Sequence, residues 1–356
     1  MSILICFGTR PEYIKVKSLI DNLPNIKTCF TGQHKDLLRL CTIKSLTKSA
    51  LIGDKGNDDH AFEKCEGVKD IKVDYELNMD TNYSNNRLNN IFCNILAIDH
   101  IFAGIEYVLV QGDTSTANAI ALSAFNNEIK IIHLEAGLRS GDLRDPFPEE
   151  MNRQVIGRLA DIHLCPTEFN KENLLKENVN RQIFVVGNTG LDNISKDGCS
   201  YNNQVLITMH RKDNHPIMDK WFETIESIAI KYSNLEFIIP LHPNPNVQKH
   251  RYIFKAVKVV DPMTHSDVIS YLKQCKFVIS DSGGLQEECS YLNKKIVVCR
   301  KTTERPESVG IHSFMCENPD KLAEIVDNIY LNYEIDAKCP YGDGNSWKNI
   351  IEILHL

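Results

Sequence analysis

The sequence predicts two doubly wound α/β domains. Short apolar runs alternate with helix-like stretches along most of the chain, and these runs are continuously apolar, as strands buried on both faces of a parallel sheet require. The alternation comes in two blocks, which a polar stretch rich in turn residues separates between residues 188 and 203. The length of 356 residues is also that of about two domains.

The expected strands of the first block span residues 3–7, 107–110, 129–134, 162–165 and 183–186, and those of the second span 205–209, 237–241, 257–260, 277–279 and 296–299. Helices are expected between the strands. Over residues 11–23, for example, apolar side chains recur on one helical face and Pro11 suits the first turn. Residues 41–70 are polar and lack a clear period, which indicates an insertion or a loop.

Composition excludes several classes of function. The 40 basic and 47 acidic residues give a net charge of −7, which lacks the basic footprint of a nucleic-acid binder. No two of the 12 cysteines stand in C-x-x-C spacing, so a zinc ribbon or a thioredoxin-like site is not supported. The apolar run at the N-terminus is short for a signal peptide, and no window approaches 18 apolar residues. We therefore expect a soluble, cytoplasmic protein without a membrane or nucleic-acid partner.

Polar or ionisable residues follow six of the expected strands, where a doubly wound sheet binds its ligands. Those of the first block are Arg10 and Lys15, Asp113, and Glu135; those of the second are His210, His242, and the segment that begins at Asp281. The loop over residues 146–150 adds two adjacent carboxylates, Glu149 and Glu150, that could reach a ligand.

Each of these residues also has a purely structural interpretation. Asp113 could only cap the helix that follows it, and Glu135 could form a salt bridge with Arg139. His210 could be a buried core histidine, which is the interpretation we favour for His133 and His163.

The segment DSGGLQEE, from Asp281 to Glu288, is more specific. A strand that ends in Ser-Gly-Gly at the start of a helix presents backbone N–H groups to an anion, and glycine lets a phosphate approach closely. Glu288 lies further along that helix, within reach of a ribose diol, and Arg305 follows the next strand. These features predict a site for a nucleotide diphosphate. The chain has neither a G-x-G-x-x-G nor a Walker A pattern, so NAD and ATP sites of the usual kind are not supported.

Eight motifs, in this order along the chain, resemble those of the non-hydrolysing UDP-N-acetylglucosamine 2-epimerases: FGTRPEYIK, GDTSTANA, HLEAGLRSGD, PFPEEMNR, GNTGLDNI, HRKDN, SDSGGLQEE and TTERPE. The resemblance implies a GT-B fold, with two Rossmann-like domains facing each other across a cleft. On this basis we expect an N-terminal domain over residues 1–190, a UDP-binding domain over 191–340, and a last helix within 341–356 that packs back on the first domain. The resemblance also implies a homodimer.

The resemblance assigns roles by matched position. The residues implied in catalysis are Asp113, Glu135, Glu149 and His210. Those implied in binding the UDP-sugar are Arg10, Lys15, Ser282, Gly283, Gly284, Glu288 and Arg305, with Glu288 on the ribose. The implied reaction eliminates UDP from C1 as a proton leaves C2, and UDP then adds back to a bound 2-acetamidoglucal. It requires no metal or other cofactor, and the three carboxylates share the roles of base and acid.

Several positions depart from the family pattern. Val268 stands where an aromatic residue near the uracil is common, and Asp213 stands where glutamate is common. Gln33 and His34 match part of a second, activating UDP-GlcNAc site, but Asn94 replaces an expected arginine, so we expect no such activation. Four other functions remain alternatives: C2 epimerisation of another UDP-acetamido sugar, such as a 6-deoxy sugar; a hydrolysing epimerase; a GT-B glycosyltransferase; and a non-catalytic UDP-sugar sensor.

Overall fold

The computed structural model of the chain describes residues 1–33, 71, 73–79, 84 and 86–355. The expected insertion over residues 41–70 lies outside these described residues. The described chain divides into two compact units. The first contains the described residues of 1–194 together with 341–355, and the second contains residues 195–340.

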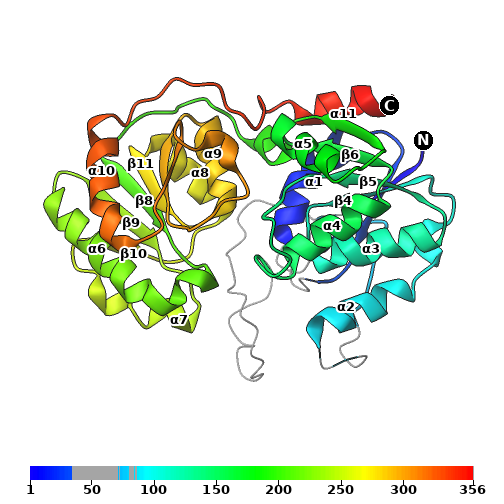
Figure 1. Cartoon of the computed structure of the whole chain (residues 1–356), viewed down its shortest axis with the longest axis horizontal. Coiled ribbons are helices and arrows are strands. Elements are labelled where there is room, and N and C mark those ends of the chain that lie inside the picture. Colours follow the sequence, from blue (N-terminus) through cyan, green and yellow to red (C-terminus); the bar gives the residue numbers. More distant parts are fainter. Residues whose placement is uncertain (34–70, 72, 80–83, 85, 356) are drawn as a thin grey trace, which may run out of the picture. The chain divides into compact units, whose positions relative to one another are not determined.

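The first unit is built on a parallel sheet with the strand order β3-β2-β1-β4-β5-β6-β7. Figure 1 labels β4, β5 and β6 of this sheet. The order reverses direction between β1 and β4, and a doubly wound sheet binds its ligands at this point, beyond the carboxyl ends of the strands. The strands are β1 (Ile3–Phe7), β2 (Ile26–Phe30), β3 (Tyr75–Glu76), β4 (Tyr107–Gln111), β5 (Lys130–Leu134), β6 (Ile162–Cys165) and β7 (Gln182–Val185).

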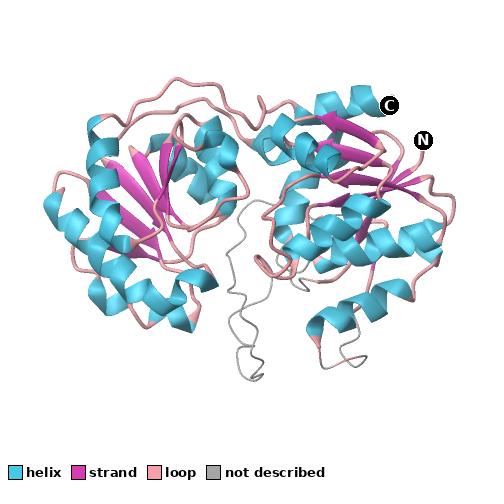
Figure 2. Cartoon of the chain, viewed as in Figure 1, coloured by secondary structure: helices cyan, strands magenta, loops and turns pink. Residues whose placement is uncertain are grey.

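Helices cover both faces of this sheet (Figure 2). Because successive strand residues point to opposite faces, Leu4 and Cys6 of β1 pack with helices α2, α3 and α4, whereas Ile3 and Ile5 pack with α1 and α11. The helices of the first unit are α1 (Arg10–Asn22), α2 (Arg87–Leu96), α3 (Ser115–Asn126), α4 (Glu149–Leu159), α5 (Glu168–Lys176) and α11 (Ser346–Leu354), with short 3₁₀ helices at His100–Phe102 and Thr189–Asn193.

The C-terminal helix α11 packs in the first unit, although the second unit precedes it in the chain. Ile350 and Leu354 enter the same apolar cluster as Val16 and Leu19 of α1. The backbone N–H groups of Ser346 and Trp347 donate to the carboxylate of Asp192 at 2.8 and 2.9 Å.

The second unit repeats this architecture with the strand order β10-β9-β8-β11-β12-β13, again all parallel. Its strands are β8 (Gln204–Thr208), β9 (Glu236–Pro240), β10 (Lys258–Val260), β11 (Phe277–Ser280), β12 (Lys295–Val298) and β13 (Ser313–Met315). Its helices are α6 (Met218–Lys231), α7 (Pro245–Gln248), α8 (His265–Gln274), α9 (Gly283–Tyr291) and α10 (Leu322–Leu331), with 3₁₀ helices at Lys212–Ile217, Arg251–Ile253, Pro306–Ser308 and Pro319–Lys321. No helix of the described residues in either unit is long and apolar enough to cross a membrane.

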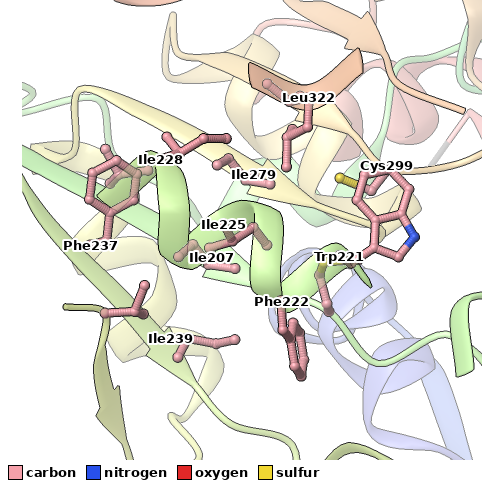
Figure 3. Close-up of a cluster of buried hydrophobic side chains, with 14 of the residues drawn as sticks. Ile207, Trp221, Phe222, Ile225, Ile228, Phe237, Ile239, Ile279, Cys299 and Leu322 are labelled. Atoms are coloured by element: carbon pink, nitrogen blue, oxygen red, sulfur yellow. The ribbon is translucent and has the colours of Figure 1, made fainter. Parts of the chain in front are cut away.

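An apolar cluster joins the sheet of the second unit to helices α6 and α10. Figure 3 shows Trp221, Phe222 and Ile225 of α6 gathered with Phe237 of β9 and Leu322 of α10. All five are almost completely buried. A cluster of this size fixes the sheet, and with it the loops at the carboxyl ends of the strands.

The ten strands predicted from apolar runs are confirmed, each within one or two residues of its observed bounds. The helix expected over residues 11–23 is α1, which starts one residue earlier because Thr9 and Glu12 form a capping box. Three strands, β2, β3 and β13, were not predicted. β3 and β13 lie at sheet edges, and β2 includes the polar residues Lys27 and Thr28, so these segments lack a continuous apolar run.

Candidate active site

Glu135 follows β5 and is held by two side chains from other elements of the first unit. Lys15 on α1 forms an ion pair with its carboxylate, and Gln111 at the end of β4 donates a hydrogen bond to it. The Glu135 side chain is 11% exposed. The suggested salt bridge between Glu135 and Arg139 is wrong, because Arg139 instead binds Glu177 with two hydrogen bonds of 2.6 and 2.9 Å.

The backbone at Glu135 has a φ of 65°, in the left-handed region that residues other than glycine rarely adopt. Strain of this kind persists only where the surrounding structure enforces it, and it occurs preferentially at functional sites. Here it accompanies a side chain that reaches both Lys15 and Gln111.

Asp113 binds a buried arginine. Its Oδ2 atom accepts a hydrogen bond from Nε of Arg153 on α4 at 2.8 Å and forms an ion pair with Nη2 of the same side chain at 2.7 Å. Asp113 does not cap α3, because Thr114 does so by accepting from the N–H of Ala117. The capping interpretation of Asp113 is therefore wrong.

Glu149 and Glu150 open helix α4 but have different surroundings. Glu150 is fully buried, where it accepts from the N–H of Ser140 at 2.9 Å and from Arg153 at 3.3 Å. Glu149 is the first helical residue and is only half-buried. Of the two adjacent carboxylates, Glu150 therefore supports the loop. That Glu149 reaches a ligand stays a prediction.

Glu12 joins the loops after β1 and β4. It is buried, and its carboxylate accepts from the N–H groups of Gly8 and Thr9 at 2.8 and 2.7 Å and from the Thr114 hydroxyl at 2.5 Å. Burial raises the pKa of Glu12, whereas these hydrogen bonds act in the opposite direction. The adjacent Arg10, at the start of α1, is half-buried.

In the second unit, Asp281 anchors the loop that carries His210. Asp281 is completely buried after β11 and accepts from the backbone N–H groups of His210 and Arg211 and from the amide of Asn214, at 2.9–3.2 Å. The His210 ring lies with Nδ1 3.6 Å from Asp281 and stacks on His242, and its side chain is 43% exposed. His210 is therefore not a core histidine.

Ser282, Gly283 and Gly284 form the start of helix α9, which has no side-chain cap. A Cβ atom on Gly283 would lie only 2.8 Å from Nη1 of Arg305, so a larger residue here would displace the guanidinium group. Arg305 itself is buried and binds Glu287 at 2.9 Å and Glu304 at 2.6 Å. The N–H groups of the first turn of α9 thus lie beside a fixed guanidinium group.

Comparisons with known proteins identify the family. A sequence profile described as UDP-N-acetylglucosamine 2-epimerase matches residues 22–355. Proteins named UDP-N-acetylglucosamine 2-epimerase from Campylobacter jejuni and Bacillus subtilis are each 35% identical to the chain, and the alignments cover 99% of it and 97% and 95% of those proteins. The chain belongs to the UDP-N-acetylglucosamine 2-epimerase family.

The fold agrees with this family. The crystal structure of UDP-GlcNAc 2-epimerase from Neisseria meningitidis bound to UDP-GlcNAc superposes with a TM-score of 0.80 at 30% identity, with 100% of both chains covered. Structures of this family have a GT-B fold, and the chain has two parallel α/β sheets, so the predicted fold class is confirmed.

Four residues hold loops or side chains of the candidate site, and the sequence assigned none of them this supporting role: Glu12, Arg153, Asp281 and His265. The capping-box pattern Thr9-x-x-Glu12 could have indicated the first. Arg153 lies in the motif PFPEEMNR and Asp281 in SDSGGLQEE, but their partners are distant in sequence. His265, which contacts Glu288, has no local sequence signal.

The positions matched to the family's activating site are only partly described. Gln33 accepts a hydrogen bond from the hydroxyl of Thr116, and Asn94 is buried in α2, where its amide donates to the Asn90 carbonyl at 2.7 Å. His34 lies outside the described residues.

Proposed function

We propose that the protein interconverts UDP-GlcNAc and UDP-ManNAc without hydrolysing either. The observation that carries this proposal is 35% sequence identity, over almost the whole chain, to proteins named UDP-N-acetylglucosamine 2-epimerase. The similar structure from Neisseria meningitidis, which is bound to UDP-GlcNAc, adds to it. The gathering of carboxylates at the carboxyl edge of the first sheet supports it independently, because the reaction must remove a proton from C2 and return one.

In this proposal the second unit binds UDP. The backbone N–H groups of Ser282, Gly283 and Gly284, at the start of α9, would hold the diphosphate with Arg305 beside them. Glu288, further along the same helix, would accept hydrogen bonds from the ribose hydroxyl groups.

The first unit would supply the proton transfers. UDP leaves C1 with the electron pair of the C1–O bond as a carboxylate takes the C2 proton, which gives a bound 2-acetamidoglucal. UDP then adds back to C1, and C2 receives a proton on the opposite face. Asp113, Glu135 and Glu149 would share these proton transfers, while Arg10, Lys15 and His210 would stabilise the negative charge of the departing UDP.

The contacts within the first unit suit this chemistry. Lys15 and Gln111 fix the carboxylate of Glu135, and Arg153 fixes that of Asp113, so neither group would need to reorient during the reaction. The low exposure of Glu135 also limits competition from water.

The test is to incubate the protein with UDP-GlcNAc without added cofactor and to separate the products. The proposal predicts UDP-ManNAc with no free ManNAc, and Glu135→Gln should lower its rate of formation at least about 100-fold, the usual size of an acid–base contribution. UDP affinity, measured by calorimetry, should change little in this variant, because the groups proposed to hold the diphosphate and the ribose lie at the start of α9 and at Glu288 in the second unit.

The matched control is Glu168→Gln, which removes an exposed carboxylate on α5 of the same unit and should leave the rate unchanged. Release of free ManNAc and UDP would move the protein to the hydrolysing class. Equal loss of turnover and of UDP affinity in Glu135→Gln would contradict the role of Glu135 in proton transfer.

A further inference from the structure

A histidine from helix α8 contacts the proposed ribose-binding carboxylate. Nε2 of His265 lies 2.7 Å from Oε1 of Glu288 on α9, within the second unit. The two side chains are 31% and 16% exposed, so the pair is accessible to a ligand.

Rigid elements hold both partners. His265 is the first residue of α8, and a capping box fixes that helical turn: Thr264 accepts from the N–H of Asp267, and Asp267 accepts from the N–H of Thr264, both at 3.2 Å. Glu288 lies within α9, whose first turn packs against Arg305. Side chains that rigid helices present in this way can be held in one orientation.

The chemistry of the two groups determines which of them donates the hydrogen bond between His265 and Glu288. An ionised carboxylate only accepts hydrogen bonds, so Nε2 carries the hydrogen and donates it to Glu288. This holds for the imidazolium ion as well as for the neutral tautomer protonated on Nε2, so the contact does not depend on the charge of His265. One of the roughly four acceptor positions of the carboxylate is then occupied, and the others are left for hydroxyl groups.

We propose that His265 is a positioning residue that fixes the Glu288 carboxylate against the ribose diol and thereby makes the site discriminate ribose from 2′-deoxyribose. This inference rests on the proposed function, in which Glu288 binds the ribose. The terminal torsion of a glutamate is broad, so an unrestrained carboxylate would lose freedom on binding a diol. The His265 contact fixes that torsion in advance, and a site built to bind a hydroxyl group rejects an analogue that lacks it.

The test measures the dissociation constants of UDP and 2′-deoxy-UDP for the full chain by calorimetry. The wild type should bind UDP about tenfold or more tightly than 2′-deoxy-UDP, as expected for a hydrogen bond to a charged group. His265→Phe should reduce this ratio about fivefold, mainly by weakening UDP binding. His265→Gln, which keeps an N–H donor, should retain most of the ratio, and Ser266→Ala, at the exposed neighbouring position on α8, should retain all of it.

A double-mutant cycle separates positioning from local packing. Glu288→Ala should bring the ratio close to one, and His265→Phe should change it no further in the Glu288→Ala background, because His265 acts through Glu288. Equal weakening of both ligands by His265→Phe, or an additive effect in the double variant, would overturn the proposal. If the wild type does not discriminate, or if Glu288→Ala still does, the ribose role of Glu288 fails and this inference fails with it. The epimerase activity itself is judged separately, by the products formed from UDP-GlcNAc.

Discussion

His133 on β5 and His163 on β6 lie with their ring centroids 6.4 Å apart, and both side chains are almost fully buried. Burial lowers the pKa of His133 to about 4 and that of His163 to about 3. His133 also contacts the carbonyl of Gly112 at 2.8 Å. The predicted burial of these two histidines in the core is confirmed, whereas the His210 side chain is exposed.

These buried histidines should make the first unit sensitive to acid. Each has a folded-state pKa below the unfolded value of about 6.5, so the unfolded chain binds the proton more readily. Their contribution to stability is therefore fully present above about pH 6.5. This contribution decreases as the pH falls from 6.5 to the folded-state pKa, which is about 4 for His133 and about 3 for His163. Each histidine loses up to about 1.4 kcal/mol of stability per pH unit over this range.

The measurement is urea unfolding followed by circular dichroism at pH 7 and pH 5. His163→Phe should lose less stability between these pH values than the wild type does. His355→Gln changes an exposed histidine at the C-terminal end of α11, and its loss of stability between these pH values should equal that of the wild type. An identical loss in His163→Phe and the wild type would contradict the assignment.

At the scale of elements, the loop after β5 carries Glu135, the proposed proton-transfer residue, and packs closely against helix α5. Glu135 and Gly137 both have positive φ values, 65° and 88°. A Cβ atom on Gly137 would lie 2.1 Å from the carbonyl oxygen of Asn170 on α5. A side chain at residue 137 would therefore force this loop or the backbone of Asn170 to move.

Gly137→Ala should destabilise the protein more than Gly141→Ala, and Gly141 is a matched control. Gly141 also has a positive φ, 85°, but its position has open space around it. Both variants incur about 1–2 kcal/mol of backbone strain, and Gly137→Ala adds roughly 1–3 kcal/mol because Asn170 must move. Urea unfolding measures this difference, and equal destabilisation of the two variants would contradict the steric argument.

The same elements show what the sequence can and cannot predict. Apolar runs are enough to locate strands such as β1, β5 and β11, because a parallel sheet buries both faces of its strands. They miss β2, in which Lys27 and Thr28 interrupt the apolar run. Contacts such as Lys15–Glu135 and Arg153–Asp113 join residues far apart in the chain, and they depend on side-chain directions that no local pattern contains.

At the scale of the whole molecule, two units of similar topology carry different chemical groups at their strand ends. The first has the carboxylates Asp113, Glu135 and Glu149. Asp113 binds Arg153, Glu135 binds Lys15, and Glu149 is the first residue of α4. The second presents a glycine-rich helix start, a buried arginine and His210. Proton transfer at a sugar and binding of a nucleotide diphosphate need these two sets of groups, and a site for UDP alone would need only the second.

The measurement that tests the central claim most directly is proton NMR of the purified protein with UDP-GlcNAc in D₂O, without added cofactor. Elimination and re-addition remove the C2 proton and return one derived from solvent, so the account predicts deuterium at C2 together with the appearance of UDP-ManNAc. If UDP-ManNAc forms with the original C2 proton retained, or if the C2 signal is unchanged while UDP still binds, the elimination account is contradicted.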